Sequence, residues 1–165
     1  MPGRPDASPA AAASVLPAGA DDPVAISDAP LRFAAGVDAG EADLIGSAFA
    51  EEATVDSAPC GRMLGLDFPP LEGREAIVGF LSATARTRIT TPGVTNLRAH
   101  RVGEMATLTA LVTATHMLRD APNRRFCMMS RYAADLVRDS ERWRMRRMVI
   151  AGAWSDGEAG VLLAR

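Results

Sequence analysis

Residues 105–119 read MATLTALVTATHMLR, and this stretch decides the fold class. Every second residue from Ala106 to Leu118 is apolar except His116, whereas most residues between them are threonine or methionine. A period of two residues is typical of a strand that buries one of its faces. The stretch therefore predicts a long antiparallel strand that carries an ionisable imidazole on its inner face.

Further strands are predicted on both sides of this stretch, with polar turn residues between them. They cover residues 94–102, 105–119, 125–138 and 142–154, after a brief strand at 54–57. The turns fall at residues 103–104, 120–124 and 139–141, which contain Gly, Asp, Asn or Ser. Long strands joined by such short turns predict an antiparallel sheet.

Three segments before these strands have apolar residues at helical spacing. The first helix is predicted to begin near Ile26, with Pro30 in its first turn, and the others cover about 41–50 and 74–84. Residues 58–72 predict a loop, because glycine and proline interrupt its apolar residues. Helices followed by antiparallel strands are typical of an α+β fold in which the helices cover one face of a curved sheet.

Composition limits the possible functions. The 165 residues are 48% hydrophobic, which is enough for one domain with a core. The formal net charge of -2 gives no basic excess for nucleic acid, and no apolar run approaches the roughly 18 residues of a membrane span. All 18 basic residues are arginine, so lysine Schiff-base chemistry and a P-loop are excluded.

Two cysteines and two histidines leave a transition-metal site poorly supplied with ligands. Cys60 and Cys127 match no zinc or redox spacing, which favours a reducing compartment. We therefore expect a cytoplasmic protein without a metal or another cofactor. Residues 1–24 are rich in Ala and Pro and predict a disordered tail without a secretory signal. Residues 25–157 are expected to form the domain, and 158–165 a C-terminal tail.

Five short motifs, in this order, resemble SnoaL-like proteins of the nuclear transport factor 2-like (NTF2-like) superfamily. They are residues 33–38 (FAAGVD), 49–56 (FAEEATVD), 71–77 (LEGREAI), 94–96 (VTN) and 143–147 (WRMRR). The resemblance covers about residues 26–157. It implies a cone-shaped α+β fold in which about three N-terminal helices cover a curved, mostly antiparallel sheet. Such folds host polyketide cyclases, dehydratases, dehydrochlorinases, ketosteroid isomerases, dioxygenase small subunits and non-catalytic carriers, so the fold alone does not give the function.

The resemblance also implies candidate catalytic residues. In members similar to scytalone dehydratase, an aspartate after the first helix and two histidines handle the proton. Asp38 matches the aspartate and His116 the second histidine, but Pro92 stands in place of the first. Proline can neither give nor take a proton, so the usual dyad is incomplete. Asp56 lies at or beside the carboxylate of ketosteroid isomerase-like members, and a desolvated aspartate there could shuttle a proton.

We expect Asp38 to orient His116 and favour its protonated form, so that the pair moves a proton on a bound ring or enolate. Tyr132 or Ser130 could polarise a substrate oxygen from the next strand. Asp38 and Asp56 could instead have only structural roles, such as capping a helix. His100 lies near a turn and is expected to face water. Four apolar candidates for the pocket lining could equally be plain core residues: Phe68, Phe126, Met128 and Trp143.

Three classes of function stay open. The leading hypothesis is a cofactor-free lyase, isomerase or cyclase that acts on a small hydrophobic cyclic or polyketide-like molecule in an enclosed pocket. Pro92 favours a second hypothesis, a non-catalytic binding protein. The third is an interaction module that forms a homodimer through the outer sheet face. That face is expected to carry Thr107, Thr109, Leu111, Thr113, Met117 and Cys127.

Overall fold

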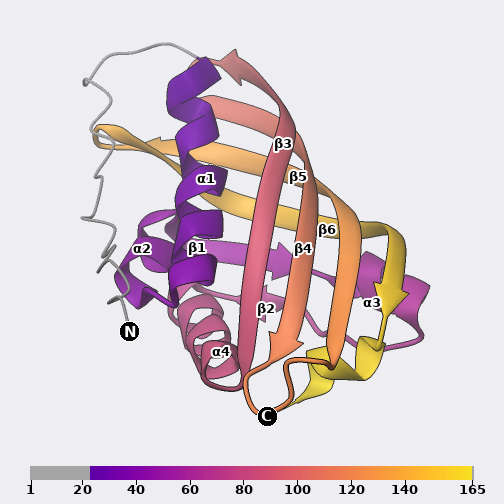
Figure 1. The fold of residues 1–165 in the computed structure, drawn as a ribbon. Coiled ribbons are helices and arrows are strands. Elements are labelled where there is room, and N and C mark those ends of the chain that lie inside the picture. Colours follow the sequence, from indigo (N-terminus) through magenta and orange to yellow (C-terminus); the bar gives the residue numbers. More distant parts are fainter. Residues whose placement is uncertain (1–22, 165) are drawn as a thin grey trace, which may run out of the picture.

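The computed structural model describes residues 23–164, in which helices pack against one face of a curved sheet (Figure 1). The helices are α1 (Pro23–Ala39), α2 (Ala42–Ser47), α3 (Ala58–Leu64), α4 (Arg74–Thr87) and the 3-10 helix η1 (Ala159–Leu163). The strands are β1 (Phe49–Asp56), β2 (Leu71–Glu72), β3 (Arg88–Val102), β4 (Met105–Leu118), β5 (Arg125–Asp139) and β6 (Arg142–Gly157). Residues 1–22 of the predicted tail lie outside the described residues.

The six strands form one sheet in the order β2-β1-β6-β5-β4-β3. All neighbours pair antiparallel except β1 and β6, which are parallel. The long strands β3 to β6 bend around α1, α2 and α4 in Figure 1. The predicted α+β fold, with helices over a mostly antiparallel sheet, is confirmed.

Strand β4 alternates in burial as its sequence predicts. The even-numbered residues from Ala106 to Ala114 are buried, and most of their odd-numbered neighbours are exposed or half-buried. Small alanines allow the helices to approach this face closely. His116 lies on the same face, where it is half-buried.

Strand β3 begins at Arg88, earlier than the predicted start at residue 94. This extension contains Pro92, although proline cannot donate a hydrogen bond to a sheet. β3 is the edge strand beyond β4, and an edge strand tolerates proline on its unpaired side. The extension places Arg88 and Thr90 opposite Leu118 and His116.

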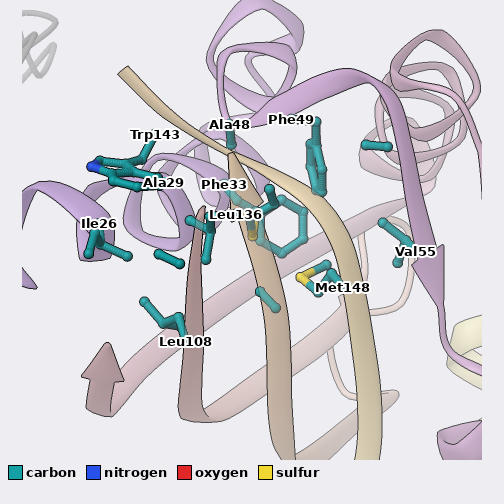
Figure 2. Close-up of a cluster of buried hydrophobic side chains, with 14 of the residues drawn as sticks. Ile26, Ala29, Phe33, Ala48, Phe49, Val55, Leu108, Leu136, Trp143 and Met148 are labelled. Carbon is teal, nitrogen blue, oxygen red and sulfur yellow. The ribbon is translucent and has the colours of Figure 1, made fainter. Parts of the chain in front are cut away.

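The main core lies between α1 and the sheet (Figure 2). Phe33 of α1 meets Phe49 of β1 edge to face, with 5.4 Å between their ring centroids. Leu108, Leu136 and Met148 pack beneath them from three different strands. These contacts hold the helices on the concave face of the sheet.

Arg32 ties α1 to two other elements. Its Nε lies 2.6 Å from Asp28 Oδ2, its Nη1 donates to Ser47 Oγ at 3.0 Å, and its Nη2 donates to the Trp143 carbonyl at 2.8 Å. Charged donors in a half-buried setting form stronger hydrogen bonds than neutral ones. Arg32 therefore fixes how α1 and α2 sit on β6.

The predicted loop at residues 58–72 was wrong in its first half, which forms helix α3. A proline suits the first turn of this helix, and Gly65 ends it in the left-handed conformation with a φ of 68°. Gly61 is a packing glycine, because a Cβ there would lie 2.6 Å from the Leu66 carbonyl oxygen. The predicted loop was wrong because Gly61 was taken to interrupt regular structure.

Two irregularities in the pairing of β5 with β6 shift the inner face of β6. Trp143 and Met145 are buried, and beyond the irregularity between Asp135 and Leu136 the next buried residue is Met148. Val149 pairs with the exposed Ala133 and lies on the outer face.

A second, smaller core closes the other end of the sheet. It contains Cys60, Leu118, Phe126, Met128 and Val161. Val161 belongs to η1 and is fully buried, so the segment expected as a C-terminal tail packs against the sheet.

Leu136→Ala should lower the free energy of unfolding by about 2–5 kcal/mol, because Leu136 is fully buried in the main core and its truncation leaves a cavity. Leu31→Ala is the matched control, since Leu31 of α1 is 44% exposed. Urea unfolding followed by circular dichroism measures both. A similar loss in the two variants would contradict the placement of the core.

Candidate active site

His116 lies on the inner face of the sheet, beside the second core. Its Nδ1 is 3.0 Å from Thr90 Oγ1 on the neighbouring strand. Its ring stacks on Phe126 of β5, with 6.2 Å between centroids. Within residues 23–164, Thr90 is the hydrogen-bond partner of this ring, so Nε2 is left for another group. The imidazole is thus held in one orientation by a hydroxyl and an aromatic ring.

Burial lowers the pKa of His116 to about 4, and the positive charge of Arg88 adds to this effect. The imidazole is therefore neutral near pH 7. This direction is opposite to the one that an aspartate partner would give. A neutral imidazole can accept a proton at one nitrogen and donate from the other.

The structure does not bring Asp38 and His116 together as a hydrogen-bonded pair. Asp38 is exposed near the end of α1, and its Oδ1 accepts a hydrogen bond of 2.9 Å from Thr91 Oγ1. Thr91 neighbours Thr90 in β3, and successive residues of a strand point to opposite faces. In this structure Asp38 therefore ties α1 to β3. Thr90, and not Asp38 as we expected, lies next to the imidazole.

Asp56 ends β1 and is half-buried. Its Oδ1 accepts a hydrogen bond of 2.9 Å from the backbone N–H of Ala58, which belongs to the first turn of α3. This contact satisfies a helix N–H that has no partner within the helix. Asp56 thus has a structural role in the described residues, and its second carboxylate oxygen accepts no hydrogen bond from them.

Ser130 and Tyr132 lie on the inner face of β5, as expected. Ser130 is 2% exposed, and Tyr132 packs against the main core. Burial raises the pKa of the Tyr132 hydroxyl, and the proximity of Cys60 raises it further. Tyr132 therefore keeps its proton at neutral pH and can donate a hydrogen bond.

The four apolar candidates separate into two places. Phe126, Met128 and Phe68 all belong to the second core, and Phe126 stacks on His116. Trp143 instead lies in the main core, where Arg101 stacks over its ring at 5.6 Å. The structure therefore places Phe126 against the imidazole and groups Met128 and Phe68 with Phe126 in one core.

Sequence reasoning missed Arg88. This side chain is 7% exposed, and its Nη1 donates to the carbonyls of Val161 and Leu162 in η1. Its Nε is buried without a hydrogen-bond partner. Position 88 fell between the predicted helix at 74–84 and the predicted strand at 94–102. Had that strand been extended back to residue 88, the alternation of its side chains would have placed Arg88 on the same face as Thr90.

The outer face of the sheet holds a shallow groove of about 500 Å³. Its side chains come from β3 to β6 and include Arg98, Thr109, Leu111, Arg131 and Val149. The groove therefore mixes small apolar side chains with arginine.

No helix within residues 23–164 is long and apolar enough to cross a membrane. No group of three or more His, Cys, Asp or Glu side chains in the same residues could hold a metal ion.

Together, the helices and the bent sheet define an α+β domain whose inner face carries several polar groups. Residues 19–149 match the family model of the SnoaL-like domain, and the chain belongs to this family. The resemblance inferred from the five motifs is thereby confirmed. A comparison with curated proteins finds no match.

Solved structures agree on the fold. A protein assigned as an aromatic ring hydroxylase from Novosphingobium aromaticivorans has a TM-score of 0.74 at 22% identity, over 85% of this chain and 95% of that one. A protein assigned as a scytalone dehydratase from the same species has a TM-score of 0.70 at 18% identity, over 82% and 86%. A hexachlorocyclohexane dehydrochlorinase (LinA, type 2) has a TM-score of 0.69 at 17% identity, over 83% and 88%. At these identities the likeness shows the fold alone.

The pKa of His116 makes stability depend on pH. Between its unfolded value of 6.5 and about 4 the unfolded chain binds a proton that the folded ring does not, so acidification through this window favours unfolding. His116→Gln should reduce the loss of unfolding free energy between pH 7 and pH 4 by at most about 3 kcal/mol.

Urea unfolding at a series of pH values measures this effect. His100→Gln is the matched control, because His100 is exposed on β3. An unchanged pH dependence in His116→Gln would show that the imidazole is not desolvated by the fold.

Proposed function

We propose that this chain is a cofactor-free acid-base enzyme that catalyses an elimination, isomerisation or ring closure on a small hydrophobic cyclic molecule. His116 would take or deliver the proton through Nε2. Polyketide-like rings are the expected substrates, because they carry acidic C–H groups beside carbonyls. The membership in the SnoaL-like family supports this class of reaction.

The observation that carries the proposal is the neutral imidazole on the inner face. His116 is oriented by Thr90 and Phe126, and Nε2 accepts no bond from residues 23–164. A positioned general base or acid accelerates proton transfer by about 10² to 10⁴-fold. A pKa lowered to about 4 makes the ring a weak base but a good donor of a transferred proton. An activated carbon acid therefore suits this site better than a poor leaving group.

Tyr132 supports the proposal from the neighbouring strand. It keeps its proton, so it could donate a hydrogen bond to a substrate oxygen on which negative charge develops. Ser130 is the other candidate for this task. Phe68, Phe126 and Met128 would contact the apolar part of the substrate.

A non-catalytic binding protein is the second candidate function. Two observations favour it: Pro92 occupies the place of the family's first histidine, and Asp38 binds Thr91 and not His116. In this case the inner face would hold a hydrophobic molecule without changing it.

Proton exchange tests the catalytic proposal without knowledge of the natural substrate. Native protein in D₂O should accelerate deuterium uptake beside the carbonyl of at least one member of a panel of bicyclic ketones and aromatic lactones, as followed by NMR. His116→Ala should lower the enzymatic rate by about 10² to 10⁴-fold. His100→Ala, the matched control, should keep the native rate.

Each outcome separates the candidates. Equal rates in native protein and His116→Ala would remove the imidazole from the mechanism, and binding without exchange would favour the carrier. Asp38→Asn and Asp56→Asn test the two remaining carboxylates. A rate loss that exceeds any loss of stability would add that carboxylate to the proton path.

We further propose that the chain forms a homodimer through the outer face of β3 to β6. Half-buried Leu111 and exposed Thr109 at the groove would be covered by the second copy. Leu111→Asp should shift the mass measured by light scattering from dimer to monomer. Leu31→Asp on α1 is the control, and a native protein that is monomeric at micromolar concentration would contradict the proposal.

A further inference from the structure

Arg88 is a buried cation whose charge is not neutralised by any side chain of residues 23–164. It is 7% exposed, and no Asp or Glu of residues 23–164 forms an ion pair with it. Burial lowers its pKa, yet an arginine guanidinium stays protonated in proteins. A buried charge without a partner of opposite sign costs several kcal/mol, so such an arrangement calls for an explanation.

Part of the side chain has a structural role. Nη1 donates to the carbonyls of Val161 and Leu162 and so holds η1 against the start of β3. These two carbonyls do not supply a negative charge, and they leave Nε without an acceptor. The contact with η1 therefore explains the role of Nη1, but it does not explain why a positive charge is buried here.

Arg88, with its buried and unpaired Nε, lies close to the candidate active site. Arg88 pairs with Leu118, and Thr90 pairs with His116 on the same face of the sheet. Diagonal neighbours in an antiparallel pair are roughly 7–8 Å apart, within reach of a long side chain. The charge of Arg88 acts on the imidazole, which agrees with this proximity.

We propose that Arg88, Thr90 and His116 together recognise a carboxylate group on the molecule that binds here. The carboxylate would pair with the Arg88 guanidinium and lie beside the imidazole. Its hydrophobic part would contact the second core, which offers Leu118 and Phe126. The inference rests on the proposed function in one respect: it names the substrate class of the same site, a hydrophobic ring that bears a carboxylate.

The carboxylate would also affect the imidazole. It would offset the positive charge that disfavours protonation of His116. A substrate with a carboxylate would therefore raise the pKa of His116, the group proposed to transfer its proton. A neutral molecule of the same shape would not.

Calorimetric titration at pH 7.5 with 2-naphthoate and 2-naphthamide tests the inference, because the two probes share a ring system and differ in charge. Native protein should bind the acid at least 10-fold more tightly than the amide. Arg88→Met should abolish this preference and leave amide binding unchanged. Arg119→Met is the matched control, since Arg119 is an exposed arginine that follows β4 and donates to the Ala85 carbonyl at 2.8 Å.

Equal affinity of native protein for the two probes, or no binding of the acid, would overturn the inference. So would an Arg88→Met variant that loses thermal stability but keeps the preference, because Arg88 would then be only a clamp. If Arg88→Met fails to fold, Thr90→Val provides the second variant and should weaken acid binding several-fold. If the protein prefers the acid but catalyses no proton exchange, this inference stands and the proposed enzyme activity is contradicted. If the protein catalyses exchange on neutral ketones but shows no preference for the acid, the enzyme activity stands and this inference is contradicted.

Discussion

The desolvation of one imidazole by a strand face is the interaction on which this account of the site depends. The alternation of β4 turns His116 inward, where Thr90 and Phe126 fix the ring. Once the ring is inside, burial and the nearby Arg88 keep it neutral at physiological pH. The protein thus holds a neutral base beside a buried cation, and neither has a carboxylate partner in residues 23–164. A bound anion would offset the uncompensated charge of Arg88.

The two cores give this arrangement its frame. The main core fixes α1 on the sheet through Phe33 and Phe49, and the second core closes the end beside His116 with α3 and η1. Arg88 joins η1 to the first residues of β3, so the C-terminal segment and the candidate site are coupled through one side chain. We expect that changes in η1 will affect binding at the site as well as stability.

Much of the fold could be predicted because periodicity and turn residues are local signals. The alternation of residues 105–118 and the short turns on either side of them predicted the long strands, and the order of the motifs predicted the SnoaL-like family. Two of the differences between prediction and structure lie at glycine and proline. Gly61 is required by contact with Leu66, and Pro92 is tolerated at a sheet edge, so both depend on tertiary neighbours that the local sequence does not contain. The site was harder still, because Thr90 and Arg88 reach His116 only through the pairing of β3 with β4.

The central claim is that the fold keeps the His116 imidazole neutral beside the Arg88 guanidinium, which has no carboxylate partner in residues 23–164. Titration of this ring in the folded protein by two-dimensional ¹H–¹⁵N NMR tests it most directly, with His100 as the internal reference. We predict one neutral tautomer of His116 from pH 8 down to the region of its pKa, about 4. A ring that titrates near the ordinary value of 6.5 would show that the imidazole is solvated, and would contradict the account.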